Sequence, residues 1–318
     1  MKQFEAVLIG AGNMGKVHLQ AALDSPYISK VYICDESPAI IQQRREEFGV
    51  ENITLDEALK NPHIRFAIIA TPNDLHAAQT LQCLNAGKGV LCEKPMSIKY
   101  EDALENVALA EKMGVKYGII FQCRFNDTSR LIKENIVNGK LGKVLSARVV
   151  LTWCKPDEYY SLSDWKGTWD KEGGGVVIDQ AIHSIDLTRW VIDSEVESVS
   201  CSMANRGHRL VDVEDSAEGL VTFKNGVKYG FFCMNNYGCD EPIEIRLFCE
   251  KGKVVFSYDD ALITYNDGTT ESAHQDENKL SYKGGKDYWG IHHVKQIRQF
   301  YNALLGKEEL EISGEEAL

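Results

Sequence analysis

Residues 4–23 read FEAVLIGAGNMGKVHLQAAL, and this stretch decides the fold of the first part of the chain. A short apolar run leads into GAGNMG at 10–15, which fits the pattern G-x-G-x-x-G, and a helical pattern follows. In this order of strand, glycine turn and helix, backbone amides at a helix N-terminus can meet a pyrophosphate without obstruction by Cβ atoms. The stretch therefore favours a dinucleotide site over a tight turn that binds nothing.

The same glycines also resemble the loop that cradles ATP, G-x-x-x-x-G-K followed by Ser or Thr. That loop needs the hydroxyl of its last residue to ligate magnesium. Here Lys16 is followed by Val17, which has no hydroxyl group. The sequence therefore argues against an ATP loop.

An acidic residue completes the dinucleotide pattern. Asp35 closes the apolar run KVYICD at 30–35 and stands 20 residues after Gly15. A carboxylate at the end of the second strand accepts hydrogen bonds from the adenosine ribose diol and repels a 2′-phosphate. NAD is therefore expected in preference to NADP.

The first 120 residues alternate short apolar runs with amphipathic ones. The runs are continuous rather than alternating, as expected of strands that are buried on both faces. Strands are predicted at 4–10, 30–35, 65–71, 89–94 and 115–121, with helices near 14–24, 37–48, 74–86 and 100–113. This alternation predicts an α/β Rossmann domain, a doubly wound parallel sheet.

The pattern changes after about residue 123. A long strand near 143–154, one apolar helix at 176–192 and two hairpins predict an α+β domain with a large, mainly antiparallel sheet. The first hairpin turns at Asn225-Gly226, which favours a type I′ turn. We expect an NAD-binding domain at 1–123 and a substrate-binding and oligomerisation domain at 124–318, with the last helix, 292–306, as a candidate to pack back on the first domain.

Composition excludes several classes of partner. The 318 residues carry a formal charge of −12, which disfavours nucleic acid and anionic membrane surfaces. No apolar run is long enough to span a membrane, and residues 1–20 do not form a secretory leader. The nine cysteines form no C-x-x-C pair, so we expect no zinc framework. Several of them sit in apolar runs, which indicates buried thiols, and the odd, scattered set favours a cytoplasmic location.

A lysine stands at the end of the strand predicted at 89–94, in the sequence Glu93-Lys94-Pro95. In open α/β sheets, ligands bind beyond the carboxyl ends of the strands. Lys94 is therefore expected near the nicotinamide end of the cofactor. The alternative is a solvated lysine before a turn.

The segment GGGVVIDQAIHSIDLTRW at 173–190 places Asp179 and His183 at positions i and i+4 of one helix face. A carboxylate there can orient an imidazole or hold its proton. The alternatives are a surface pair or a hydrogen-bonded core histidine. Because the helix is otherwise apolar, both groups need a partner or a function.

Aromatic and charged residues alternate between 153 and 169, among them Trp153, Trp165 and Lys166. Aromatic faces pack on the C–H surfaces of sugars and charged groups bind their hydroxyls, so this segment indicates a carbohydrate or polyol pocket. The alternative is a folded loop with buried aromatics. Lys155 and Lys166 also leave open a phosphate or carboxylate, but the chain shows no further basic cluster for a diphosphate.

Taken together, these motifs resemble the Gfo/Idh/MocA oxidoreductases, the glucose-fructose oxidoreductase and inositol dehydrogenase group. The resemblance covers essentially the whole chain. It rests on the ordered set GAGNMG (10–15), Asp35, ATPNDLH (70–76), EKP (93–95), the helix with Asp179 and His183, VEDSAEGLVTF (213–223) and GIHHVKQIRQF (290–300). The glycine motif alone is generic, whereas the ordered set is specific.

The resemblance implies roles for individual residues. Lys94, Asp179 and His183 match the catalytic positions, and Pro95 matches a proline that often follows a cis peptide bond. The cofactor positions are Gly10, Gly12, Asn13, Met14, Gly15, Asp35, Thr71, Pro72, Asn73, His76, Glu93, Lys94 and Gln122. The substrate positions are Lys94, Arg124, Trp153, Trp165, Lys166, Asp179, His183 and His293. For His76 the alternative is a helix-start residue without cofactor contact, and for Arg124 an ion pair between domains.

The hypothesis is an NAD-dependent dehydrogenase that moves a hydride between nicotinamide and a secondary alcohol or ketone of a sugar, glycoside or cyclic polyol. His183 is the expected base, Asp179 orients it, and Lys94 stabilises alkoxide charge. The alternatives are a nucleotide-sugar dehydrogenase with tightly bound NAD and a non-catalytic NAD(H) sensor. No metal is expected, because no third ligand at a suitable spacing accompanies His292 and His293. The resemblance implies a homodimer or homotetramer through the second domain's sheet.

Overall fold

The computed structural model describes residues 4–274 and 292–318, which belong to two compact units. The first unit comprises the described residues up to Gln122 and those from 292 to the end, and the second begins at Cys123. The sequence-based division ran the second domain to residue 318. In the structure, the helices α9 (His293–Leu304) and α10 (Gly314–Ala317) belong to the first unit.

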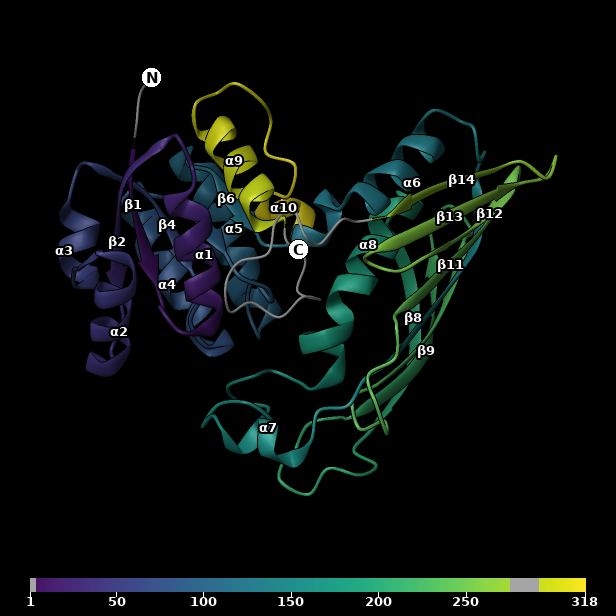
Figure 1. The fold of residues 1–318 in the computed structure, drawn as a ribbon, viewed down its shortest axis with the longest axis horizontal. Helices are drawn as coiled ribbons and strands as arrows, with labels where there is room; N and C mark the ends of the chain where they lie inside the picture. Colours follow the sequence, from purple (N-terminus) through teal and green to yellow (C-terminus); the bar gives the residue numbers. More distant parts are fainter. Residues whose placement is uncertain (1–3, 275–291) are drawn as a thin grey trace. The chain divides into compact units, whose positions relative to one another are not determined.

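The first unit is a parallel six-stranded sheet with helices on its faces (Figure 1). The strand order is β3-β2-β1-β4-β5-β6, so the order reverses between β1 and β4. The strands are β1 (Phe4–Ile9), β2 (Ile28–Cys34), β3 (Glu51–Asn52), β4 (Ile64–Ile69), β5 (Gly89–Cys92) and β6 (Tyr117–Ile119). The helices that connect them are α1 (Asn13–Leu23), α2 (Pro38–Phe48), α3 (Leu55–Lys60), α4 (Asn73–Asn85) and α5 (Tyr100–Met113). This confirms the predicted doubly wound fold.

The last long helix belongs to this unit because it shares the unit's core. Ile297 and Phe300 of α9 are buried with residues of the parallel sheet, including Phe66. The next residue, Tyr301, stacks on Tyr27 with 4.6 Å between the ring centroids. The apolar side of α9 therefore covers one side of the sheet.

The second unit is an eight-stranded sheet in the order β14-β13-β12-β11-β7-β10-β9-β8. All neighbours are antiparallel except β7 and β10, which confirms the predicted α+β class. The strands are β7 (Val144–Thr152), β8 (Val196–Ala204), β9 (Ser216–Phe223), β10 (Lys228–Met234), β11 (Glu244–Cys249), β12 (Gly252–Phe256), β13 (Asp260–Tyr265) and β14 (Thr270–His274). The helical elements are η1 (Gln122–Phe125), which crosses the boundary between the units, α6 (Asp127–Val137), α7 (Asp157–Ser161), the π-helical turn η2 (Val177–Ala181) and α8 (Ile182–Ile192).

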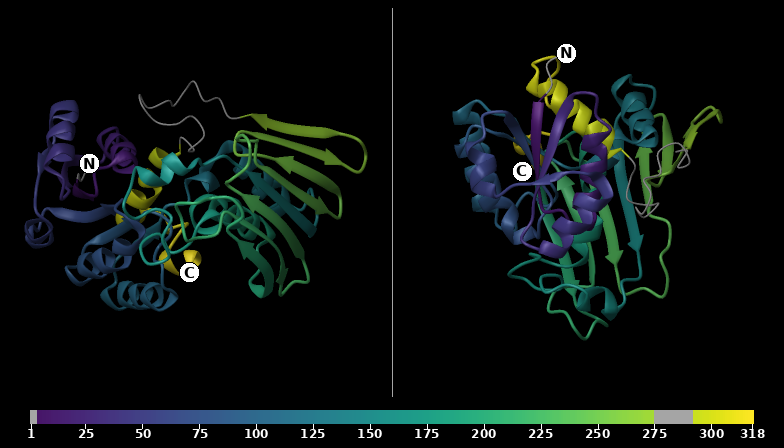
Figure 2. Two further views of the ribbon diagram at one scale, coloured as in Figure 1. Left: turned by 90° about the horizontal axis from the view of Figure 1, so that it is seen from below. Right: turned by 60° about the vertical axis from the view of Figure 1, so that its left-hand side comes forward.

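The helices α6 and α8 pack on one face of this sheet (Figures 1 and 2). Side chains that point to this face, such as Val221, Phe223 and Tyr229, form the core. The other face carries the exposed side chains of Leu220 and Leu262, which alternate with the core positions along β9 and β13. Among the described residues of this unit, no helix covers that other face.

The turn between β9 and β10 differs from the predicted type I′ turn. That turn needs positive φ at both central residues. Gly226 has φ +87°, but Asn225 does not have positive φ. The Asn225 side chain instead accepts a hydrogen bond from the backbone N–H of Val227 at 3.1 Å. The loop comprises residues 224–226, because Phe223 and Val227 are paired on either side of it.

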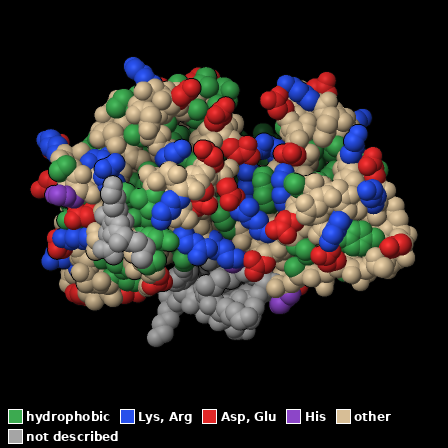
Figure 3. Space-filling view, turned by 90° about the horizontal axis from the view of Figure 1, so that it is seen from above, with side chains coloured by type: hydrophobic (Ala, Val, Ile, Leu, Met, Phe, Trp, Pro, Cys, Tyr) green, Lys and Arg blue, Asp and Glu red, His purple; other side chains and the backbone are tan. Residues whose placement is uncertain are grey.

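On the face shown in Figure 3, Lys and Arg side chains are interspersed with Asp and Glu side chains. Within the described residues, no helix has the length and apolar character needed to cross a membrane.

Candidate active site

The glycine loop of the first unit is shaped by two close backbone approaches. Gly10 has φ +86°, and a Cβ there would lie 2.6 Å from the carbonyl oxygen of Ala70. A Cβ on Gly15 would lie 2.1 Å from the carbonyl oxygen of Gly10. Both positions must be glycine for the loop to pack against β4 and α1.

Gly12 is different, because a Cβ on this residue would meet nothing within 4 Å. Gly12 is the N-cap of α1, and no side chain caps that helix end. The first turn of α1 also carries no acidic side chain. A helix N-terminus with uncapped amides and open space beside Gly12 fits an anionic pyrophosphate, so the residues present suit a dinucleotide.

Asp35 links the glycine loop to the end of β2. Its carboxylate accepts hydrogen bonds from the backbone N–H of Ala11 at 2.7 Å and of Ser37 at 2.9 Å. Each carboxylate oxygen has a second lone pair, so Asp35 keeps the capacity to accept ribose hydroxyls. The structure thus places Asp35 beside the loop, as the spacing predicted.

Arg44 of α2 supports the same loop, and the sequence analysis did not single it out. Its guanidinium donates to the carbonyl oxygens of Ala11 at 2.9 Å and Gly12 at 3.3 Å. The side chain is buried. Two arginines stand side by side in the segment QQRREEF, and nothing in that pattern distinguishes the buried one from its neighbour.

The loop after β4 contains Thr71, Pro72 and Asn73, and Pro72 is the N-cap of α4. His76 lies beneath this loop, with its two ring nitrogens 2.9 Å from the carbonyl oxygen of Thr71 and 2.7 Å from that of Pro95. Burial lowers the pKa of His76, although both carbonyls act in the opposite direction. The imidazole therefore connects the loop after β4 to the loop after β5, where the Lys94–Pro95 peptide bond is cis.

A buried acid–histidine cluster, Glu93 with His18 and His293, adjoins Lys94. The Glu93 carboxylate lies 2.6 Å from His18 Nε2 and 4.0 Å from His293 Nε2. Burial would raise the pKa of Glu93, but the hydrogen bond and charge of His18 and the charges of His293 and Lys94 lower it to about 2. Glu93 is thus an ionised carboxylate behind the lysine, in the same unit.

The three residues of this cluster offer ligand atoms within 4.8 Å of one another, so they form a candidate metal centre. The sequence analysis saw no third ligand for His293, because His18 and Glu93 stand far from it in the chain. The 2.6 Å contact between His18 and Glu93 is a hydrogen-bond distance. Ligands of one tetrahedral zinc ion are separated by about 3.3 Å. The cluster as built is therefore a hydrogen-bonded acid–base set.

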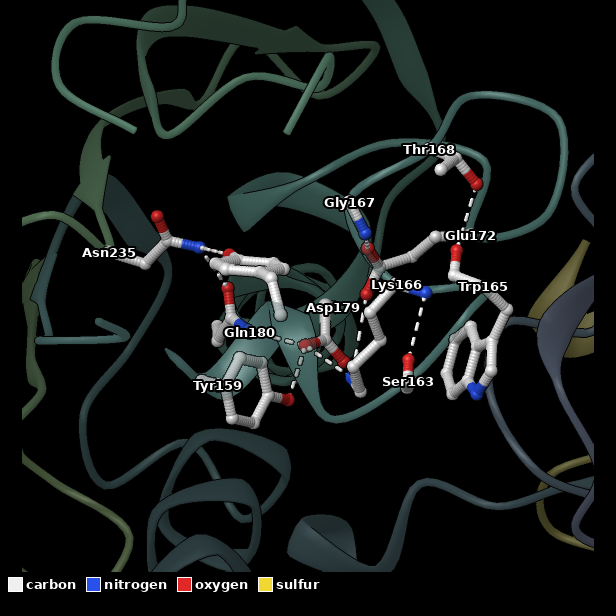
Figure 4. A network of polar contacts seen from close by, with 11 residues as sticks. Tyr159, Ser163, Trp165, Lys166, Gly167, Thr168, Glu172, Asp179, Gln180 and Asn235 are labelled. Atoms are coloured by element: carbon white, nitrogen blue, oxygen red, sulfur yellow. Dashed lines mark hydrogen bonds and ion pairs between the residues drawn. The ribbon is translucent and has the colours of Figure 1, made fainter. Parts of the chain in front are cut away.

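In the second unit, Asp179 accepts three hydrogen bonds on one oxygen atom. Its Oδ2 receives the hydroxyl of Tyr159 at 3.4 Å, the ammonium of Lys166 at 3.3 Å and the side-chain amide of Gln180 at 2.5 Å. Figure 4 shows these side chains pointing at Asp179 from α7, from the following loop and from η2. These donors, one of them the ammonium group of Lys166, stabilise the ionised form of the Asp179 carboxylate.

Lys166 also faces a second buried acid, Glu172, at 3.5 Å. Glu172 accepts the backbone N–H of Gly167 and is 1% exposed. Burial and, next, the charge of Asp179 raise the pKa of Glu172 to about 7, although Lys166 and the Gly167 N–H oppose this. One lysine therefore contacts two carboxyl groups, the partly buried Asp179 and the buried Glu172, and Glu172 holds a proton near neutral pH.

The helix that carries Asp179 and His183 begins against Glu214. The Glu214 carboxylate accepts the backbone N–H groups of Gly175 at 2.9 Å and Val177 at 3.1 Å. A Cβ on Gly175 would lie 1.9 Å from the Glu214 carbonyl oxygen, so this position requires glycine. The first turn is π-helical, and His183 follows in α8 as a half-buried residue.

The other predicted substrate residues are more dispersed. The Trp165 ring lies 4.7 Å from Lys166 Nζ, and Lys166 in turn contacts Asp179. Trp153 packs against the core and donates to the Glu241 carbonyl at 3.2 Å. Arg124 is buried and forms a two-pronged ion pair with Asp186 of α8.

Comparison with known proteins identifies the family of the chain. Residues 4–121 match the model of the Gfo/Idh/MocA oxidoreductase family with an NAD-binding Rossmann fold, and residues 129–255 match the model of its C-terminal domain. The 1,5-anhydro-D-fructose reductase of Ensifer adhaerens is 34% identical over 180 residues, which is 56% of this chain. This match spans about half (53%) of that relative's length. The levoglucosan dehydrogenase of Pseudarthrobacter phenanthrenivorans is 26% identical over 81% of this chain and 75% of its own.

Solved structures show the same fold over nearly the whole chain. The WlbA dehydrogenase from Bordetella pertussis, in complex with NADH and UDP-GlcNAcA, has a TM-score of 0.86 at 26% identity, with 99% of this chain and 92% of that chain covered. Levoglucosan dehydrogenase in complex with NADH and levoglucosan has a TM-score of 0.87 at 22% identity, with 99% and 93% covered. The first unit is thus an NAD-binding Rossmann domain.

The glycine loop gives a test that separates binding from folding. Gly12→Ala places a methyl group in open space, so we expect the melting temperature to stay near that of the wild type while NAD affinity falls on the order of tenfold or more, about 1.4 kcal/mol per factor of ten. Isothermal titration calorimetry with NAD measures the affinity. Gly15→Ala is the matched control, because its methyl group meets backbone and should destabilise the fold by about 3 kcal/mol. Unchanged NAD affinity in Gly12→Ala would contradict the assignment.

The raised pKa of Glu172 predicts a pH dependence of stability. Because the folded state holds this proton up to about pH 7 and the unfolded state only to about 4.5, the contribution is complete below pH 4.5 and is lost as pH rises through 7. Glu172→Gln removes this titration. We therefore expect the melting temperature of the variant, relative to the wild type, to rise between pH 5 and 8.5. A difference in melting temperature between variant and wild type that stays constant across that pH range would show that the pKa of Glu172 is not raised.

Proposed function

Because the chain belongs to the Gfo/Idh/MocA oxidoreductase family, we propose that it is an NAD-dependent dehydrogenase acting on a secondary alcohol of a free sugar, glycoside or cyclic polyol. The observation that carries the proposal is the group on Asp179 in the second unit, where Lys166, Tyr159 and Trp165 offer a cation, a hydroxyl and aromatic faces beside a carboxylate. Such a set suits a polyhydroxylated ligand with C–H surfaces.

The sequence relatives support the same class of substrate. Several are by their names dehydrogenases or reductases of sugars and polyols, among them the levoglucosan dehydrogenase and a myo-inositol 2-dehydrogenase from Thermotoga maritima that is 27% identical over 78% of this chain. The nucleotide-sugar and NAD(H)-sensor alternatives are not favoured by these relatives.

The proposed chemistry divides between the two units. Bound NAD supplies the hydride acceptor or donor. In the second unit, His183 takes the hydroxyl proton of the alcohol, and Asp179 orients the imidazole and stabilises the charge that forms on it. In the first unit, Lys94 stabilises alkoxide charge, and Glu93 with its two histidines sets the electrostatic environment of that lysine.

Lys94→Ala tests this assignment. Loss of the ammonium should lower kcat by about 100-fold to 10,000-fold, the usual contribution of a proton-transfer or charge-stabilising group, with NAD affinity retained. NADH formation is followed at 340 nm across a panel of inositols, aldoses, anhydrosugars, glycosides and UDP-sugars. His183→Asn should give a comparable loss. If the wild type oxidises no compound of the panel, the dehydrogenase proposal is refuted. If Lys94→Ala keeps the full wild-type rate, Lys94 takes no part in the reaction.

We also propose that the chain forms a homodimer or homotetramer through the uncovered face of its second sheet. The exposed side chains of Leu220, Phe248 and Leu262 lie on three strands of that face. An exposed apolar sheet face is a typical subunit interface.

The oligomer proposal is tested by charge insertion. Leu262→Asp places a carboxylate on the uncovered face and should shift the mass measured by light scattering toward the monomer. Val137→Asp is the control, because Val137 is an even more exposed apolar residue on α6, on the opposite side of the sheet. A wild-type protein that is already monomeric, or a Leu262→Asp variant with unchanged mass, would refute this interface.

A further inference from the structure

A buried chain of polar side chains runs from Asp179 to the margin of the second unit. Gln180 Oε1 accepts from Asn235 Nδ2 at 2.9 Å, and Asn235 Oδ1 lies 3.3 Å from Nε2 of His208. His208 Nδ1 lies 3.0 Å from Asp157 Oδ1. Figure 4 shows the part of this chain from Asn235 through Gln180 to Asp179.

The middle members of the chain are buried, and no proposed step of the reaction uses them. Gln180, Asn235 and His208 are 4%, 0% and 8% exposed. Asp157, at the start of α7, is partly exposed, with 33% of its side-chain surface accessible. Buried amides and a buried imidazole require hydrogen-bond partners, so the chain has to be satisfied at every link.

The chemistry of the two ends fixes the direction of every hydrogen bond. Asp179, ionised beside Lys166, only accepts, so Gln180 must turn its NH₂ group to Asp179 and its oxygen to Asn235. Asn235 then donates to Gln180 and also to the Tyr160 hydroxyl at 2.8 Å. Its remaining oxygen faces His208, so Nε2 must carry a proton.

The other ring nitrogen of His208 faces Asp157, which also only accepts, so Nδ1 must carry a proton as well. An imidazole with protons on both nitrogens is a cation. Tyr160 packs edge-on against this ring, with 5.0 Å between centroids, and the buried Asp215 accepts the backbone N–H of His208 at 3.4 Å. Asp157 is thus the carboxylate at the ring, and Asp215 holds the backbone of the same residue.

We propose that Gln180, Asn235 and His208 are positioning residues for Asp179, forming a directed hydrogen-bond chain in which an ionised Asp179 requires a doubly protonated His208. The chain has one other self-consistent state. In that state both amides are reversed, the Asp179 carboxyl donates to Gln180, and His208 is neutral with Nε2 as an acceptor. Because the intermediate directions leave a buried group unsatisfied, the two ends change together.

The inference rests on the proposed function in one respect, namely that Asp179 acts in the reaction. The chain itself links two charge states that can be read without turnover. The group at each end has further titratable or charged neighbours that the experiment must hold constant. These are Lys166, Glu172, Tyr159 and the proposed base His183 at Asp179, and Asp157 at the His208 ring with Asp215 at its backbone N–H.

The decisive variant is Gln180→Met. It keeps the side-chain length and the charge of the site but removes both hydrogen bonds of the amide, so any electrostatic effect acting through space is preserved. The full-length protein is labelled at histidine nitrogens and aspartate carboxyl carbons, and NMR reads the protonation of His208 and the titration of the Asp179 carboxyl. Assignments come from His208→Phe and Asp179→Asn.

In the wild type at pH 7 we expect the His208 spectrum of a doubly protonated ring. In Gln180→Met we expect the doubly protonated fraction to fall and the midpoint of the Asp179 titration to rise by about one pH unit, a tenfold change in the protonation ratio. Asp164→Asn, which removes an exposed carboxylate of the same segment, is the control and should change neither signal. A neutral His208 in the wild type, or unchanged signals at both ends in Gln180→Met, would overturn the proposal.

A second variant covers a failure of Gln180→Met to fold. Asp179→Asn presents an amide that can either donate or accept, so the chain loses its fixed direction and His208 should lose its second proton. An unchanged His208 in that variant would equally refute the coupling.

Kinetics then connect the chain to the reaction. On whichever sugar the wild type oxidises, Gln180→Met should move the acidic limb of the kcat/KM profile, which reports the proposed base His183, to higher pH with unchanged NAD affinity. The reason is that an Asp179 carboxylate with one donor fewer stabilises the His183 imidazolium more strongly. If the protein oxidises no sugar but shows both NMR effects, the directed series of hydrogen bonds is supported and only the dehydrogenase proposal is refuted. A merely structural amide would lower activity at all pH values and leave the profile in place.

Discussion

The ionised carboxylate of Asp179 is the constraint on which the second unit's site depends. A partly buried carboxylate is costly unless donors replace the water it has lost. Tyr159, Lys166 and Gln180 supply those donors from three different segments, so one charge fixes the position of α7, of the loop after it and of the helix start. Lys166 then attracts a second acid, Glu172, which holds a proton because one cation does not neutralise two carboxylates in a buried place.

The glycine loop of the first unit follows a different principle. Its shape is set by backbone contacts, in which a Cβ on Gly10 or Gly15 would overlap carbonyl oxygens. Arg44 and Asp35 hold the same loop through its carbonyl and amide groups. Backbone groups present the same chemistry whatever the side chains, which suits a cofactor whose pyrophosphate does not vary. The side-chain site around Asp179 is, by contrast, specific to its residues.

The sequence carried enough information for the fold and for the residues that lie within one motif. Spacing within a strand–turn–helix unit predicted the glycine turn, and Asp35, 20 residues after Gly15, lies beside that turn as predicted. Spacing carries no information about pairs joined only by tertiary structure. His18, Glu93 and His293 form one cluster although they lie on α1, after β5 and at the start of α9. Likewise, nothing in the sequence DQAIH predicts that Gln180 forms a hydrogen bond with Asn235, which follows β10.

Amides make such a distant contact informative, because a carboxamide donates at one end and accepts at the other. Apolar side chains between Asp179 and His208 would form no hydrogen bonds, and hydroxyl groups could rotate to donate to either neighbour. Neither would link the protonation of the two residues. Two amides in series keep the direction that the carboxylate imposes and deliver it to the imidazole. The burial of Gln180 and Asn235 excludes the water that would otherwise satisfy a mismatched end. The direction of these hydrogen bonds thus links the charge of Asp179 to the charge of His208.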